Sequence, residues 1–210
     1  VRKKKVRSVR LGRKLVGVIG LSSVVILIAA LITFGFSNNE FSFFDDFISK
    51  LGALGQPNAI WFNLTAFVLV EILLIVFGFC YGRLLNNQLL SILLSLFGLG
   101  FSFTAISTDM NIPNSHYSKA HMVSICLGLA FWLFGLSRLG SNPMLQKKIR
   151  MRANFTAIAL VLSMAGFGLG LWSMPITHRL VFGIVFGWTA VTSIELIFNK
   201  QVTANLNSTS

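Results

Sequence analysis

The sequence predicts an all-α membrane protein: a bundle of six transmembrane helices with both termini in the cytoplasm. Of its 210 residues, 54% are apolar and only 11% are charged, whereas a soluble domain carries about 25% charged residues. The mean hydropathy of +0.76 also favours a membrane protein. Two cysteines are too few for a disulfide scaffold. This composition excludes a soluble globular fold and a disordered chain.

Six apolar stretches of about 20 residues, the length that crosses a bilayer, follow one another along the chain. We expect helices at Leu15–Phe36, Ala59–Gly82, Leu89–Ser107, Ala120–Leu139, Phe155–Ser173 and Leu180–Phe198. The first stretch is longer than a signal-peptide core, which indicates a retained anchor. The chain thus divides into a basic cytoplasmic segment (1–14), a six-span membrane domain (15–199) and a cytoplasmic tail (200–210).

The basic residues fix the expected orientation. Fifteen of the 18 Lys and Arg residues flank the spans on one side, and only Lys50, Lys119 and Arg179 fall on the other. The positive-inside rule therefore places both termini in the cytoplasm. Anionic lipid headgroups attract basic residues at such positions, so membrane lipids rather than nucleic acid account for the net charge of +12.

The rare polar residues gather on the opposite, outer side. All three histidines and four of the six acids fall there. In the first outer loop, apolar residues from Phe44 to Leu51 recur at helical spacing, which predicts a short amphipathic helix on the outer surface. Ser42 and Asp45 resemble a capping box at its start. This loop either covers the bundle or contributes Ser49 to a pocket.

These positions predict an outward-facing polar site that binds a lipid headgroup or a small polar ligand. Arg179 would pair with an anionic group such as a phosphate. Asp109 would orient His121, whose imidazole suits pH sensing or proton transfer, and Ser49 would cover the pocket. Further candidates for ligand contacts are Asn63, His116 and His178.

Two alternatives stay open. An intramembrane lipid hydrolase would use Ser49, His121 and Asp109 as nucleophile, base and acid, although no G-x-S-x-G motif is present. The second alternative is that the protein is a structural or accessory subunit of a larger membrane complex. A metal site needs three or four well-placed ligands, and His116 and His121 do not share a helix face, so we expect neither a metal nor a cofactor.

Glu71 is the one acid near the middle of a span. A charge there is costly, so Glu71 is either a proton or cation relay or a neutral carboxyl bonded to a Ser or Thr on another span. Small-residue motifs that permit close helix packing occur at Gly166 with Gly170 and at Gly183 with Gly187. We expect them to pack the last two spans together or to contact protein partners in the membrane.

The chain resembles a prokaryotic membrane family known as domain-of-unknown-function family 998. The resemblance covers roughly residues 15–198 and rests on short motifs: Ile48-Ser-Lys-Leu-Gly52, Pro57-Asn-Ala59 with Asn63, Asp109, His121 and Arg179. It implies that Ser49, Asn63, Asp109, His121 and Arg179 act together, in a multi-pass protein of a prokaryotic plasma membrane. A more distant likeness links the chain to the six-spanning damage-regulated autophagy modulator family. Neither family supplies a reaction, and Glu71 departs from the pattern of the first.

Overall fold

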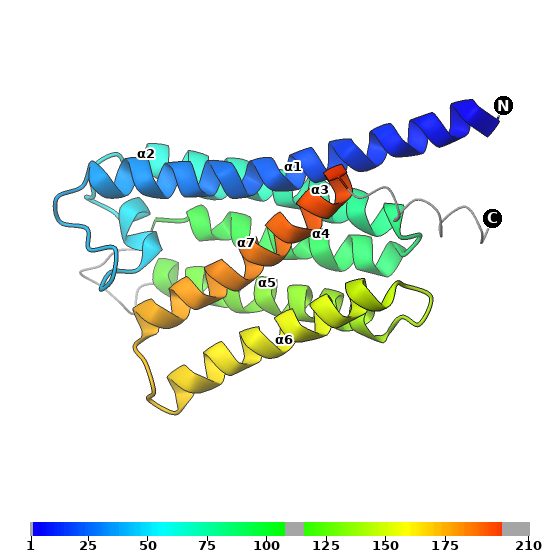
Figure 1. The fold of residues 1–210 in the computed structure, drawn as a ribbon. Helices are drawn as coiled ribbons and strands as arrows, with labels where there is room; N and C mark the ends of the chain where they lie inside the picture. Colours follow the sequence, from blue (N-terminus) through cyan, green and yellow to red (C-terminus); the bar gives the residue numbers. More distant parts are fainter. Residues whose placement is uncertain (1, 108–115, 199–210) are drawn as a thin grey trace.

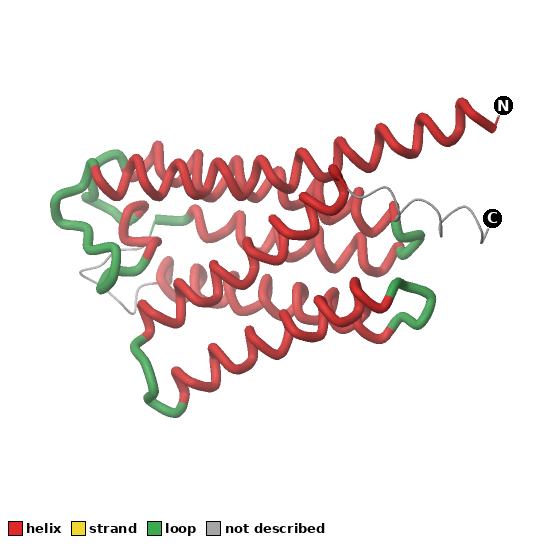
Figure 2. Tube along the Cα trace, viewed as in Figure 1, coloured by secondary structure: helices red, strands yellow, loops and turns green. Residues whose placement is uncertain are grey.

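The computed structural model describes residues 2–107 and 116–198, and every regular element in these ranges is helical (Figure 2). The membrane spans are carried by α1 (Arg2–Phe36), α2 (Ala59–Phe62) with η2 (Asn63–Leu69) and α3 (Val70–Leu84), α4 (Gln88–Ser102) with η3 (Phe103–Ala105), α5 (His116–Ser141), α6 (Lys147–Gly168) and α7 (Met174–Phe198). Six helical segments in the described residues are long and apolar enough to cross a membrane. The predicted six-span architecture is confirmed.

The six spans close into a ring. Each packs against the next along the chain, and α7 returns to α1, in the order α1, α3, α4, α5, α6, α7. Figure 1 shows α7 crossing the bundle obliquely, with α1 beginning and α7 ending at the same end of the molecule. We call this end, which carries Arg83, Arg138 and Lys147, the basic end. The opposite end, where His116, His121 and His178 lie, is the histidine end.

The fifth span differs from its predicted limits at both ends. Its helix α6 starts at Lys147, eight residues before the expected Phe155, and ends at Gly168 rather than Ser173. The basic residues of the preceding loop are therefore part of the helix. At its end, Gly170 takes a left-handed φ of 72°. The amides of Gly170 and Leu171 donate to the carbonyls of Phe167 and Gly166 at 2.9 Å, a Schellman motif that stops the helix.

The glycines that bring helices close together are not the ones the motifs indicated. A Cβ added at Gly183 or Gly187 would meet nothing within 4 Å, and the ring of Trp172 covers Gly166. The expectation that these motifs pack α6 against α7 is therefore wrong. Close approaches occur instead where α3 meets α4, since a Cβ at Gly78 or Gly82 would come within 2.3–2.9 Å of the α4 backbone.

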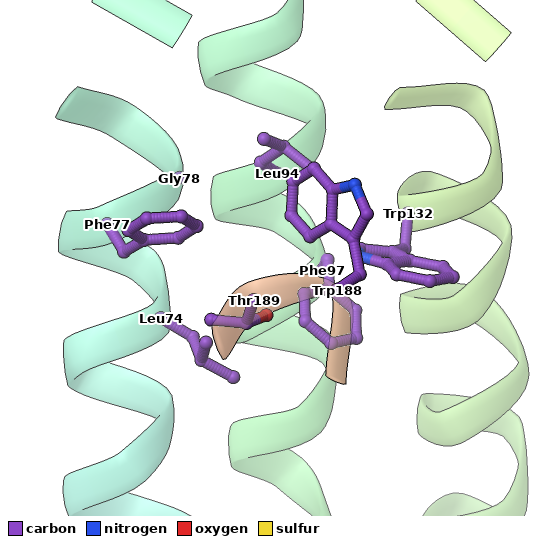
Figure 3. Close-up of a pocket in the computed structure, with 8 residues that line it drawn as sticks. All are labelled: Leu74, Phe77, Gly78, Leu94, Phe97, Trp132, Trp188 and Thr189. Atoms are coloured by element: carbon purple, nitrogen blue, oxygen red, sulfur yellow. The ribbon is translucent and has the colours of Figure 1, made fainter. Parts of the chain in front are cut away.

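Aromatic rings fill the centre of the ring of helices. They form an unbroken series of contacts with centroids between 4.9 and 6.1 Å apart, running through His178, Phe182, Phe101, Phe97, Trp132, Trp188 and Tyr81. Figure 3 shows a small cavity beside the two tryptophans, lined also by Thr189 of α7. Its volume of about 10 Å³ has room for one water molecule at most. Among the described residues, the region around these rings is a packed core.

Candidate functional site

Arg179, in the first turns of α7, fastens the loop between α1 and α2 to the histidine end. Its Nε donates to the carbonyl of Phe43 at 2.6 Å, its Nη2 to that of Asp46 at 2.7 Å, and its Nη1 to that of Pro175 at 2.7 Å. A fourth, longer bond of 3.5 Å reaches the carbonyl of Ser42. A guanidinium has five N–H donors, so one is left for other partners. Pairing of Arg179 with an anionic group remains a prediction.

The loop under Arg179 contains a shorter helix than the sequence predicted. Only Ile48–Gly52 (η1) is helical, as a 3₁₀ turn that buries Ile48 and Leu51. Ser42 Oγ accepts from the N–H of Asp45 at 3.2 Å, one of the two bonds of a capping box, but η1 begins only at Ile48 with Phe47 as its N-cap, so the predicted capping of a helix by Ser42 and Asp45 is wrong. The carbonyls of Phe43 and Asp46, which precede η1, accept hydrogen bonds from the guanidinium of Arg179.

Asp46 holds this loop in shape. Its Oδ2 accepts hydrogen bonds from Lys50 Nζ and from the backbone N–H of Ser42, both at 2.8 Å. Burial alone would raise the pKa of the Asp46 carboxyl, but the bonds from Lys50 and Ser42 and the charges of Lys50 and Arg179 outweigh it and lower the pKa below its ordinary 3.8. Hydrogen bonds and positive charges favour the ionised form.

His121, near the start of α5, is a buried histidine with one free ring nitrogen. Its exposed fraction is 8%, and its ring makes backbone hydrogen bonds to Thr104 and Ile106. The N–H of Ile106 already donates to the carbonyl of Phe103 at 3.2 Å, so the ring is the donor to the Ile106 carbonyl. Nδ1 has no partner in the described chain. We therefore assign the ring hydrogen to Nε2, which leaves Nδ1 with a lone pair.

His178 of α7 lies at the same end of the bundle as His121 of α5. Its ring contacts the rings of Phe47 and Phe182, with centroids at 6.0 and 4.9 Å. Its Nδ1 is also buried without a partner among the described residues. The histidine end thus brings together two imidazoles from different helices, each with an unmatched buried nitrogen.

Asn63 connects two segments around these histidines. Its Nδ2 donates to the carbonyl of Gly52 at 2.9 Å and to Ser107 Oγ at 3.0 Å. A Cβ at Gly52 would overlap Asn63 Oδ1, so a larger residue there would displace the Asn63 side chain. Asn63 therefore joins η1 to Ser107, two residues after η3, and a direct ligand contact through it remains a prediction.

The other candidates are more scattered. Ser49 is half-buried and makes no side-chain hydrogen bond to the described residues, so the structure does not join it to His121. His116 is exposed at the start of α5, and Asp109 lies outside the described residues. Glu71 is buried in α3, away from this end. Within the described ranges, no three His, Cys, Asp or Glu residues lie close enough together to hold a metal ion.

A second polar cluster, at the basic end, was not foreseen. Glu195 of α7 accepts hydrogen bonds from Arg152 Nη1 at 2.5 Å and from Lys148 Nζ at 2.6 Å, and Tyr81 bonds to Arg152. The sequence offered no signal for this cluster, because Glu195 and Arg152 are 43 residues apart. This cluster joins α3, α6 and α7 at the basic end of the bundle.

Comparison with known proteins identified the family of the chain. A family model described as "Protein of unknown function (DUF998)" matches residues 8–197. No curated protein and no solved structure matches the chain. Because the matched range takes in all six spans and both histidines of the candidate site, the chain belongs to the DUF998 family.

Proposed function

We propose that this membrane protein binds a lipid headgroup or another small polar ligand at the histidine end. The observation that supports the proposal is the pair of buried Nδ1 atoms of His121 and His178, neither with a partner in the described chain. A buried polar atom without a hydrogen bond costs about 1–3 kcal/mol. A ligand whose polar groups bond to both nitrogens would remove this free-energy cost at each of them.

The tautomer of His121 narrows the chemistry of this ligand. Its Nδ1 presents a lone pair, so the group that faces it is a hydrogen-bond donor such as a hydroxyl or an ammonium. The rings of Phe47 and Phe182 beside His178 offer apolar surface to the carbon skeleton of a headgroup. The distribution of basic residues supports a site that opens away from the cytoplasm, as in a plasma-membrane protein.

Native mass spectrometry of protein extracted in a mild detergent tests the proposal, because a co-purified ligand is then identified by its mass. We expect the wild type to carry a bound lipid or polar molecule, and His121→Ala and His178→Ala each to lose it. His116→Ala is the matched control: the sequence also offered His116 as a ligand contact, but its side chain is exposed, so we expect its loss to leave the bound mass unchanged.

Equal retention of the bound mass in all three variants would contradict the assignment of the site. A wild-type protein that carries no ligand, and that gains none from vesicles of total membrane lipid, would contradict ligand binding itself. Circular dichroism on each variant separates loss of ligand from loss of fold.

A further inference from the structure

The second span contains a π-helical segment, η2, between α2 and α3. In an α-helix, residues eight apart point about 80° away from each other. A π-helical turn takes up one extra residue, so Asn63 and Glu71 come to within about 20° of the same direction. Burial agrees with this geometry: Asn63, Phe67 and Glu71 are all buried at a spacing of four residues. The π-helical segment therefore turns Glu71 into the bundle.

Glu71 lies in surroundings that offer it no counter-charge. Its side chain is 1% exposed, and its Oε2 has no hydrogen-bond partner in the described chain. Of the elements packed against α3, neither α4 nor η2 carries an acid or a base, and α1 carries none from Leu15 onward. In α7 the stretch 180–194 has none, and in α5 the stretch 122–137 has only the exposed Cys126.

An isolated charge at this depth costs about 2.5–3.5 kcal/mol even on insertion scales. The carboxyl therefore carries a proton rather than a charge, yet its Oε2 lacks the bond to a Ser or Thr that would explain a purely structural role. π-Helical turns are rare insertions in α-helices and are frequently found at functional sites. Relaxation of one such turn to α-helix rotates the residues on one side of it by about 100°.

We propose that Glu71 is a proton-binding site inside the membrane, and that rearrangement of the π-helical segment Asn63–Leu69 exposes its carboxyl to water. The proton leaves the carboxyl for water when the segment rearranges, and the carboxylate takes a proton back before it returns to the core. This inference does not depend on the ligand site at the histidine end.

Infrared spectroscopy of the ligand-free protein in phosphatidylcholine vesicles tests the inference. The wild type minus Glu71→Gln difference spectrum should contain the C=O band of a protonated carboxyl, and this band should move to lower frequency after transfer to D₂O. Glu195→Gln is the matched control: it removes an ion-paired carboxylate at the basic end and should leave the band unchanged. Glu71→Asp should keep a carboxyl band at a shifted position.

Two results would overturn the inference. Absence of any protonated carboxyl band that depends on Glu71 would show that the side chain is charged. A band that never responds to D₂O would show a trapped proton with a structural role only. The response of the wild-type band to D₂O needs no variant, so the test holds even if Glu71→Gln folds poorly.

Discussion

Arg179 shows how far a single residue can be understood from the sequence. Its place at the outer start of the last span followed from the pattern of apolar stretches. Its partners did not, because Phe43 and Asp46 precede it by 136 and 133 residues, and backbone carbonyls leave no trace in the residue types. The sequence favoured an anion as its partner, whereas the structure commits most of its donors to the loop.

Replacing Arg179 by lysine should release this loop although the positive charge stays. A lysine ammonium cannot reproduce the planar array of donors, and a hydrogen bond to a charged group contributes about 1.5–3 kcal/mol. We expect Arg179→Lys to lose about 1–3 kcal/mol of stability and to speed amide hydrogen exchange in residues 42–50. Lys119→Gln, an exposed charge at the same end, should change neither, and equal exchange in both variants would contradict the role given to Arg179.

Asp46 gives the loop a defined pH dependence. The pKa of its carboxyl is lowered in the folded state, so the folded state binds this proton less readily than the unfolded state. The resulting stabilisation is complete above the ordinary pKa of 3.8 and is lost as the pH falls through the lower folded-state value.

Asp46→Asn should therefore melt below the wild type at neutral pH, and the gap in melting temperature should narrow once the pH falls below about 4. Glu40→Gln serves as control, because Glu40 is exposed and its carboxylate has no described hydrogen bond. A gap for Asp46→Asn that stays constant down to pH 2 would show that the carboxylate charge is irrelevant to the loop.

The helices as elements were predictable, but their irregularities were not. Length and hydropathy located all six spans, since a bilayer imposes both. The π-helical segment escaped detection because its sequence is ordinary; its only trace is the four-residue spacing of buried residues from Phe62 to Leu74. The exposed Gly183 and Gly187 show the opposite error, where a motif is present without the contact it usually serves.

Because of the π-helical segment, single-residue deletions at two positions of this span should affect stability differently. Removing Leu64, an exposed residue within it, should let the segment relax to α-helix while Asn63 and Glu71 keep their common direction. Removing Ile72, equally exposed but in regular α3, should rotate one half of the span by about 100°. We expect the Leu64 deletion to melt within a few degrees of the wild type and the Ile72 deletion to fail to fold. Similar melting of both would contradict the geometry described for η2.

At the scale of the whole molecule, the closed ring separates two ends of different chemistry. Composition predicted this separation correctly, because the basic residues lie beside the spans of one end. Which side of the membrane each end faces follows only from the positive-inside rule. The sequence also placed His121 and His178 at one end, but the burial of each Nδ1 without a described partner could not be derived from it, since burial depends on how the helices pack.

Accessibility labelling tests this orientation in a protein whose two cysteines, Cys80 and Cys126, have been replaced by alanine. His116→Cys and Ser141→Cys then place one exposed thiol at each end. A maleimide that cannot cross membranes should label His116→Cys in intact cells and Ser141→Cys only after permeabilisation. The reverse pattern would turn the histidine end toward the cytoplasm.

The chain has three histidines, so nitrogen NMR of protein labelled with ¹⁵N-histidine resolves the proposed binding residues directly. We predict that His121 shows a bare, hydrogen-accepting Nδ1, and that removal of co-purified ligand shifts the ring signals of His121 and His178 but not those of His116. A doubly protonated His121 ring, or signals from both buried rings that stay unchanged when the ligand is removed, would contradict the account.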